Sequence, residues 1–177
     1  MRTEFRLSGS GGQGLLLAGI VLAEAGILED KNVAQTQSYG PEARGGSSKA
    51  EVVISDSDID YPKCTDPDYL LALTDASYKA YGPLQGKGII IVDSSIALDP
   101  AIKAKTISVP ILETTKKVGK MIVTNIVALG VIGGLSGIVT QETLENAVLD
   151  RVPKGTEELN VSALKAGFEL AAKLKKD

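Results

Sequence analysis

Along the first two thirds of the chain, short apolar segments of the length of a strand alternate with longer apolar segments. This pattern predicts strands that alternate with helices. The stretch 12–28 is apolar on nearly all sides until Glu24, so it predicts a helix that is buried on more than one side. A second helix is expected from Thr74 or Asp75, because both residue types cap helix N-termini well. The predicted strands occupy residues 3–8, 32–37, 49–55, 69–73, 88–95 and 104–111.

The last third of the chain is predicted to be helical, over residues 114–133, 140–150 and 156–176. Together the elements indicate an α/β fold: one Rossmann-like domain over residues 1–177, with a mostly parallel twisted sheet flanked by helices. The connection from the second strand to the third is too short for a crossover helix, so that part of the sheet is expected to be antiparallel or irregular. The last predicted strand should lie toward an edge, because Pro110 cannot donate to a sheet ladder.

The stretch 121–139 carries no charged residue and is long enough in principle to cross a bilayer. It also contains Asn125 and four glycines, and the pair Gly133-Gly134 indicates a break rather than a span. The favoured interpretation is a buried helix in which Gly130 and Gly134 allow close packing on the sheet or on a partner chain.

The composition of the chain excludes several classes of function. Of 177 residues, 44% are hydrophobic and 23% are charged, and the net charge of −3 favours neither nucleic acid nor anionic lipid as a partner. The chain has one cysteine, Cys64, and no histidine, so no iron–sulfur cluster, common metal site or histidine-based triad is predicted. Charged residues interrupt the amino-terminal segment, so no signal peptide is predicted. A cytoplasmic protein without a metal site is expected.

The stretch "LSGSGGQG" places a glycine-rich turn between a predicted strand and a predicted helix. Gly9, Gly11 and Gly14 give the spacing G-x-G-x-x-G, in which glycines permit a tight turn and close approach of the backbone to a ligand. Because the first N–H groups of a helix lack partners, a phosphate is the first candidate ligand. A glycine turn that only packs the helix on the strand remains the alternative.

A nicotinamide dinucleotide would require an acidic residue at the tip of the second strand to hold the ribose hydroxyls. Here that tip reads Gln-Thr-Gln-Ser, and Glu29 and Asp30 precede the strand instead of ending it. The sequence therefore lacks the acidic residue that a nicotinamide dinucleotide site requires in addition to the glycine loop.

A second candidate site is the block "SYGPEARGG", which holds one acid, Glu42, and one base, Arg44, between turn-forming residues. The second strand is expected to run beside the first, which would bring the start of this block near the glycine loop. Arg44 could then clamp a phosphate or a carboxylate. The alternative is that Arg44 pairs with Glu42 or docks against another subunit.

Four blocks, in this order and spacing, resemble one family over essentially the whole length: "SGSGGQG", "QSYGPEARGGSSKAEVVISD", Asn125 with Leu129-Gly130, and "ELNVSALKAGF". The chain resembles the gamma subunit of the 2-oxoacid:ferredoxin oxidoreductases, most of all the 2-oxoglutarate type. Such enzymes oxidatively decarboxylate a 2-oxoacid on thiamine diphosphate, pass electrons through iron–sulfur clusters to ferredoxin, and release an acyl-CoA.

The resemblance implies that this chain handles coenzyme A and contributes subunit contacts, with no catalytic residue of its own. Contacts to partner subunits are expected from Glu42, Asn125 and Gly130. The expected ligand-binding residues are Gly9, Ser10, Gly11, Gly12, Gln13, Gly14, Ser38, Tyr39, Gly40, Arg44, Gly45 and Gly46.

The residue inventory agrees with an accessory role, because the sequence has no Gly-Asp-Gly motif, no cysteine set and no histidine. Thiamine diphosphate, magnesium and the iron–sulfur clusters are therefore expected on partner alpha, beta and ferredoxin-like delta subunits, with ferredoxin as the electron acceptor. A homodimer of this chain is a further expectation. The alternatives are an indolepyruvate or pyruvate oxidoreductase subunit, a stand-alone NAD-binding protein, and a purely structural module.

Overall fold

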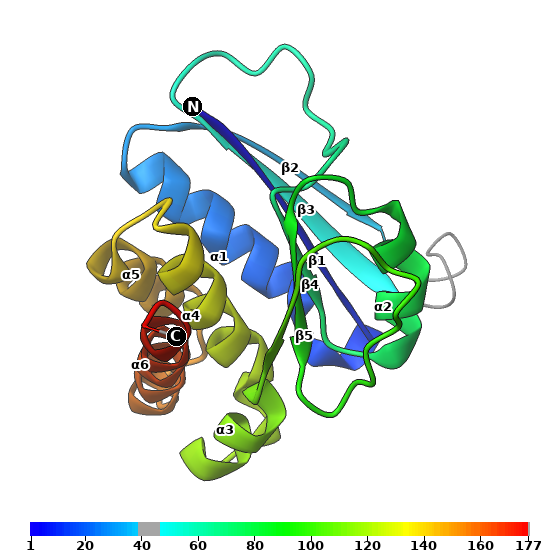
Figure 1. Ribbon diagram of the computed structural model, residues 1–177. Helices are drawn as coiled ribbons and strands as arrows, with labels where there is room; N and C mark the ends of the chain where they lie inside the picture. The colour runs from blue at the N-terminus through cyan, green and yellow to red at the C-terminus, as the bar shows by residue number, and fades with distance from the viewer. Residues whose placement is uncertain (39–46, 177) are drawn as a thin grey trace.

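The computed structural model describes residues 1–38 and 47–176, which form a twisted six-stranded sheet with helices on both faces (Figure 1). The strand order is β2-β3-β1-β4-β5-β6. Strands β1, β4, β5 and β6 are parallel, whereas β3 is antiparallel to both of its neighbours. The strands are β1 (Arg2–Gly9), β2 (Asn32–Ser38), β3 (Ser48–Ser55), β4 (Tyr69–Ala72), β5 (Ile89–Asp93) and β6 (Thr106–Val109).

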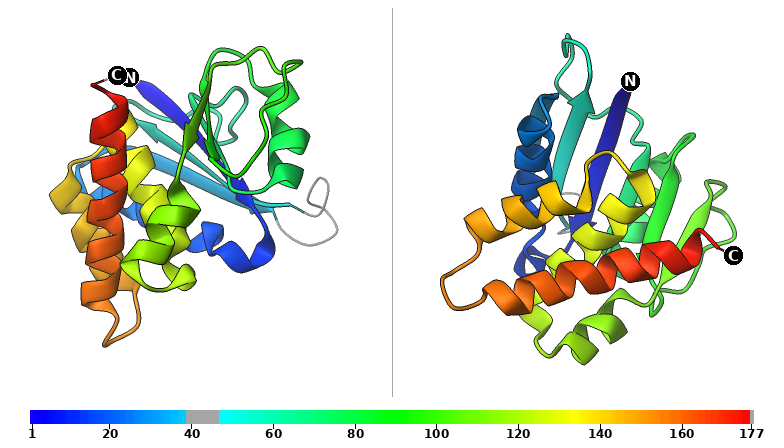
Figure 2. Two further views of the ribbon diagram at one scale, coloured as in Figure 1. Left: turned by 60° about the horizontal axis from the view of Figure 1, so that its bottom comes forward. Right: turned by 90° about the vertical axis from the view of Figure 1, so that its left-hand side faces the viewer.

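Four helices, α1, α4, α5 and α6, gather on one face of the sheet, and α2 covers part of the other (Figures 1 and 2). Alternate residues of the central strands serve the two faces: Leu71 and Ile91 enter the large core, and Leu70 and Ile90 enter the smaller one. The helices are α1 (Leu15–Leu28), α2 (Asp75–Tyr81), α3 (Ile111–Val118), α4 (Thr124–Ser136), α5 (Gln141–Arg151) and α6 (Glu157–Leu174), with short 3-10 turns η1 (Gly11–Gln13), η4 (Gly82–Leu84) and η5 (Met121–Val123).

The predicted α/β class and the antiparallel part of the sheet are confirmed. The predicted neighbour of the first strand is wrong, because β3 and not β2 pairs with β1. A short connection suits antiparallel neighbours, so β2 pairs with β3, and β3 then lies between β2 and β1. The expected edge position of the last strand is confirmed, with Pro110 immediately after β6.

Three predicted helix boundaries are wrong for reasons of backbone geometry. The single helix expected over 114–133 is two helices, because Gly119 has a φ of 128° and ends α3 there. The break expected at Gly133-Gly134 is absent, since α4 continues to Ser136 and ends at Gly137, whose φ is 62°. The first helix begins at residue 15 and not 12, because Gly14 is left-handed with a φ of 69°.

Helix α4 is buried, and it packs against α6 through glycines. A side chain at Gly130 would collide with the backbone carbonyl of Leu164, and Gly167 of α6 faces Gly130 at the same crossing. The close approach of the two helices therefore explains the glycines in this apolar stretch. Within residues 1–38 and 47–176, no helix is both long and apolar enough to span a membrane.

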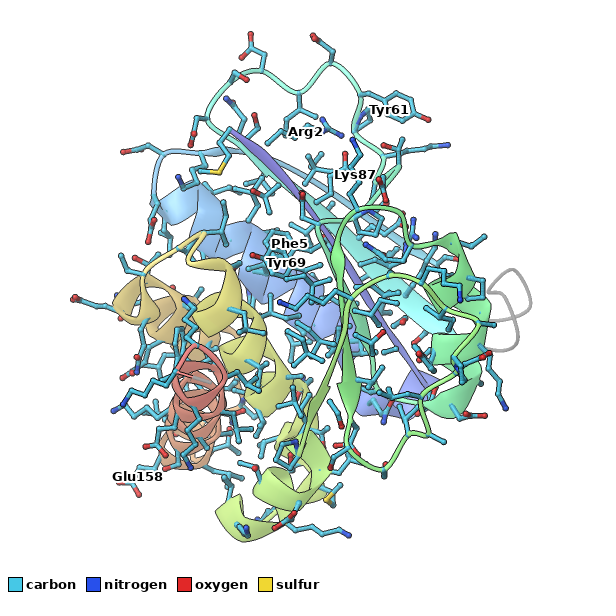
Figure 3. The ribbon with its side chains drawn as sticks, viewed as in Figure 1. Arg2, Phe5, Tyr61, Tyr69, Lys87 and Glu158 are labelled. Atoms are coloured by element: carbon cyan, nitrogen blue, oxygen red, sulfur yellow. The ribbon has the colours of Figure 1, made fainter. Side chains whose placement is uncertain are left out.

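On the face opposite α1, the loop of residues 56–68, here called the strap, is held against β1 by charged side chains. The guanidinium of Arg2 donates to the carbonyl of Tyr61 at 2.9 Å, and both side chains lie at the same end of β1 in Figure 3. The carboxylate of Glu4 accepts from the N–H of Thr65 at 2.7 Å. Burial by itself would raise the pKa of Glu4, but hydrogen bonds from Arg2 and from strap N–H groups hold it below its ordinary value.

A buried ion pair lies next to the strap on the same face. The guanidinium of Arg6 contacts the carboxylate of Glu51 at 2.7 Å, and the ammonium of Lys49 contacts it at 3.0 Å. Arg6 also lies over the ring of Tyr81, 5.6 Å from its centroid. Within the strap itself, Cys64 is buried, and this burial raises the pKa of its thiol.

Candidate functional site

The glycine loop connects the carboxyl end of β1 to α1 and is closed by two hydrogen bonds. The N–H of Gln13 donates to the carbonyl of Ser10 at 3.1 Å, and the N–H of Ser10 donates to the side-chain carbonyl of Gln13 at 2.8 Å. Ser10 and Gln13 thus hold the loop in shape, which is the local reason that a turn can form directly after Gly9.

Two glycines of the loop are not required by packing. A side-chain carbon added at Gly11 or Gly12 would meet no other atom within 4 Å, and neither residue has a left-handed φ. Both residues are exposed. The absence of side chains here leaves backbone open at the surface, an arrangement that permits close approach of a ligand.

Gly14 is required by the fold, and Asn125 of α4 is its partner. The side-chain amide of Asn125 donates to the Gly14 carbonyl at 3.1 Å, and a side chain at Gly14 would collide with that amide. Asn125 is 4% exposed, and its Oδ1 is buried with no hydrogen-bond partner among the described residues. The start of α4 is therefore fixed to the turn that leads into α1.

An apolar groove of about 380 Å³, here called the loop groove, opens beside these glycines. Ile122 at its edge is 81% exposed, and Leu17 and Leu159 belong to its wall. The lining residues are Gly11, Gly12, Gly14, Leu17, Ile122, Val123, Asn125, Val152, Pro153, Thr156, Leu159 and Asn160. A helix N-terminus next to an apolar groove suits a ligand that joins an anionic group to a less polar arm.

The second predicted block begins at the same end of the sheet as the glycine loop. Gly9 pairs with Ser48 across β1 and β3, and Ser38 pairs with Lys49 across β2 and β3. Ser38 therefore lies two strand spacings from β1, about 10 Å, with β3 between them. The other predicted residues of this block lie outside the described residues: Tyr39, Gly40, Glu42, Arg44, Gly45 and Gly46.

Two residues expected at subunit contacts are buried within this chain. Gly130 is covered by α6, and Asn125 contacts the glycine loop. Contact of either residue with a partner subunit stays a prediction. Their burial shows that α4 serves the chain's own core, which apolar patterning alone cannot distinguish from a subunit interface.

Sequence reasoning assigned no role to most walls of the loop groove. Val152 and Leu159 come from the end of α5 and the start of α6, more than a hundred residues beyond the glycines. Only the block "ELNVSALKAGF", which contains Leu159 and Asn160, was singled out by resemblance. No spacing rule links such distant segments, because tertiary packing brings them together.

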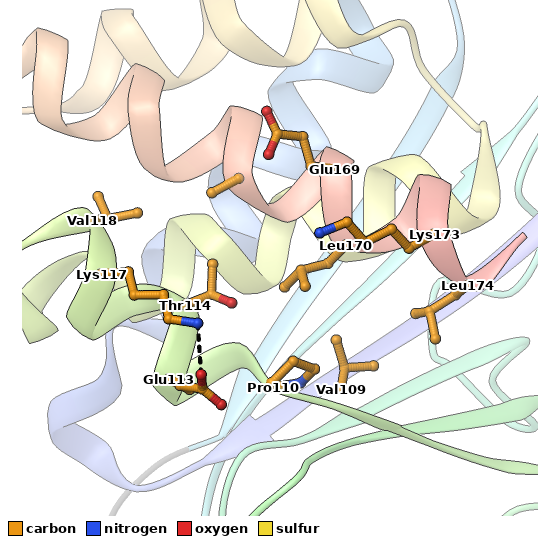
Figure 4. Close-up of a pocket in the computed structure, with 11 residues that line it drawn as sticks. Val109, Pro110, Glu113, Thr114, Lys117, Val118, Glu169, Leu170, Lys173 and Leu174 are labelled. Atoms are coloured by element: carbon orange, nitrogen blue, oxygen red, sulfur yellow. Dashed lines mark hydrogen bonds and ion pairs between the residues drawn. The ribbon is translucent and has the colours of Figure 1, made fainter.

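A second groove, of about 490 Å³, lies between α3 and α6 and contains none of the predicted site residues (Figure 4). Its walls include Val109, Leu170 and Leu174, and its edge carries Glu113 and Lys117, which pair with each other at 2.6 Å. Within the described part of the chain, no three His, Cys, Asp or Glu side chains gather into a candidate metal site.

Comparison with known proteins identifies the family. Residues 4–170 match the family described as pyruvate ferredoxin/flavodoxin oxidoreductase. The chain is 46% identical to the 2-oxoglutarate synthase subunit KorC of Methanocaldococcus jannaschii over 180 residues, covering 98% of this chain and 96% of that protein.

Solved structures agree with this result. The gamma subunit of a keto/oxoacid ferredoxin oxidoreductase from Geobacter sulfurreducens superposes with a TM-score of 0.87 at 46% identity, covering 98% of each chain. The 2-oxoglutarate:ferredoxin oxidoreductase of Magnetococcus marinus, with 2-oxoglutarate, coenzyme A and succinyl-CoA bound, shares the fold with a TM-score of 0.89 at 21% identity. That match covers 99% of this chain and 32% of the other. The chain therefore belongs to the pyruvate ferredoxin/flavodoxin oxidoreductase family and has the fold of its gamma subunits.

Proposed function

We propose that this chain is the gamma subunit of a 2-oxoglutarate:ferredoxin oxidoreductase. The support is the 46% identity to a 2-oxoglutarate synthase subunit over nearly the full length of both proteins. In this proposal alpha, beta and ferredoxin-like delta subunits carry thiamine diphosphate, magnesium and the iron–sulfur clusters, and ferredoxin receives the electrons. We further propose that the complex acts in the cytoplasm.

The chain's own contribution to the reaction is a surface that handles coenzyme A. The observation that carries this is the exposed backbone of Gly11 and Gly12, which packing does not require to be glycine, directly beside an apolar groove. The loop N–H groups and the start of α1 would hold phosphate oxygens. The groove walls formed by Leu17 and Leu159 would contact the less polar arm of the molecule. When bound, coenzyme A supplies the thiol that accepts the acyl group.

Gly11→Val in the assembled complex tests this assignment. The valine side chain would project where the backbone is now open, so we expect the KM for coenzyme A to rise about tenfold, or about 1.4 kcal/mol. The KM for 2-oxoglutarate and the elution volume of the complex should stay unchanged. Ala101→Val, on an exposed turn far from the loop in sequence, is the matched control. An unchanged KM for coenzyme A in an intact complex would contradict the assignment.

Substrate class is tested separately with the same complex. Rates of dye reduction with 2-oxoglutarate, pyruvate and indolepyruvate, each with coenzyme A, are compared. We expect 2-oxoglutarate to give the largest kcat/KM. Preference for pyruvate or indolepyruvate would assign the chain to another enzyme of the same family while leaving the role of the glycine loop intact.

A further inference from the structure

Helix α1 has one apolar flank that the described chain covers only in part: Ala23 is buried, whereas Ile27 is exposed. Its sheet side carries Gly19 and Gly26, which lie against β3 and β2. Another side turns toward α5, where Glu24 pairs with Arg151 at 2.6 Å. The remaining flank carries Leu16, Ile20, Ala23 and Ile27, spaced by four, three and four residues along one face.

This flank, here called the α1 stripe, is exposed where its side chains are large. Ile27 is 61% exposed, and Leu16 and Ile20 are half-buried. Figure 2 (right) shows α1 at the margin of the helical layer, with no helix beyond it. A helix that is apolar on all sides is normally buried on all sides. The exposed part of the stripe therefore indicates a surface that another protein chain covers.

The strand below the stripe is also unpaired on its outer side. Among the described residues, β2 is the terminal strand of the sheet, and its seven residues include no charge and no proline. Native edge strands are usually short, charged or interrupted by proline. The other edge follows that rule, because β6 has four residues and is followed by Pro110.

We propose that β2 and the α1 stripe together form a two-fold interface with a second copy of this chain. Two β2 strands would pair antiparallel and join the two sheets, and the two α1 helices would pack against each other on the same face. This inference goes beyond the proposed function, since it concerns a surface separate from the loop groove.

The spacing of the elements fits a second copy. Gly19 faces both Ala50 of β3 and Gln35 of β2, so α1 lies above the space between these strands. Joining two β2 edges, with strands about 4.8 Å apart, would then place the two α1 axes about 10 Å apart. Packed helices lie about 8–10 Å apart, so pairing of the strands also brings the stripes into contact.

The register is consistent with the same two-fold axis. Gln35 is the central residue of β2, and it lies beneath Gly19, near the middle of α1. The helices would therefore cross near Ile20 and Ala23, where a small side chain permits close approach. Neither β2 nor the stripe contains a charged residue, and the nearby Glu24 is paired with Arg151. Two copies can therefore meet here without like-charge repulsion. A self-complementary, uncharged surface favours a second copy over a charged partner segment.

Sedimentation equilibrium of the full chain tests the interface. We expect a dimer for the wild type and a monomer for Ile27→Lys, with dimerisation weakened at least about tenfold. Leu98→Lys is the matched control, since Leu98 is 51% exposed on another part of the surface and should leave the dimer intact. Melting curves check that each variant is folded.

Cross-linking locates the axis independently. In Ile20→Cys the two introduced thiols should approach across the axis and form an intermolecular disulfide under mild oxidation, whereas Leu98→Cys should not. A wild-type chain that stays monomeric at the highest attainable concentration would overturn the proposal. So would a dimer that Ile27→Lys leaves unchanged, or a monomer whose Ile27→Lys variant loses a partner subunit on co-purification. None of these results depends on the KM for coenzyme A, so the two proposals fail separately.

Discussion

The side-chain amide of Asn125 donates a hydrogen bond of 3.1 Å to the carbonyl of Gly14, across 111 positions of sequence. This contact ties the first turn of α4 to the end of the glycine loop. The shape of the candidate site therefore depends on a helix that contributes no residue to the loop itself, and on a glycine whose φ of 69° is stabilised by that helix.

Substitutions at Asn125 should reveal which side-chain atom matters. Asn125→Ala removes one hydrogen bond to the loop and should lower the free energy of unfolding by about 1 kcal/mol. Asn125→Asp replaces the donor with a buried carboxylate facing the Gly14 carbonyl and should cost more, about 2–4 kcal/mol at neutral pH. Urea unfolding of both variants measures the difference. An aspartate variant more stable than the alanine variant would show that the donor is not essential.

The two kinds of glycine in the loop should respond differently to the same change. Gly14→Ala places a side chain at a left-handed φ and against Asn125, so it should destabilise the fold by about 1–3 kcal/mol. Gly11→Ala meets no atom within 4 Å and should change stability by less than about 0.5 kcal/mol. Thermal melting of the pair tests this. Equal losses would mean that Gly11 also serves the fold.

Gly130 should be intolerant of any side chain for a different reason, namely helix packing. Gly130→Ala would place a methyl group against the Leu164 carbonyl in the contact between α4 and α6, which should cost about 1–3 kcal/mol or force the helices apart. Gly12→Ala, in open space, is the matched control. Denaturant unfolding with an unchanged midpoint for Gly130→Ala would contradict the packing seen between these helices.

Glu4 should make stability depend on acidity. Its pKa in the folded chain lies below the ordinary value of 4.5, so the carboxylate contributes stability above that pH and loses the contribution as the pH falls through the folded pKa. Glu4→Gln should be less stable than the wild type at neutral pH, and the gap should shrink as the pH falls below 4.5. Melting temperatures across this range measure the effect. A gap that stays constant with pH would mean that the charge of Glu4 contributes nothing.

The strands and the glycine loop were predictable because they depend on local sequence. Alternating and continuous apolar runs mark strands, and the spacing of Gly9, Gly11 and Gly14 marks a turn between a strand and a helix. The antiparallel β3 followed from the length of one connection. The strand order could not be predicted in the same way. The length of the connection shows that β2 pairs with β3, but it does not show which of these two strands then pairs with β1.

The roles of the later glycines could not be predicted from composition. Gly119 ends a helix through its backbone angle, whereas Gly133 lies inside a helix close to Leu144 and Phe168. Both read alike in sequence, because a glycine permits a turn and a close contact equally. The contact of Asn125 with Gly14 and the walls of the loop groove could not be predicted either. The residues that form them come from distant segments that meet only in the folded chain.

The strap gives this chain a built-in reporter of local opening. The chain's single cysteine, Cys64, belongs to this segment, is 7% exposed, and lies between the two positions that Arg2 and Glu4 hold. A thiol reagent can reach this sulfur only when the segment lifts, so the labelling rate equals the intrinsic rate multiplied by the opening equilibrium constant when closing is fast. The free energy of opening of the strap can therefore be measured in the unmodified chain, alone or within its complex, without introducing any probe.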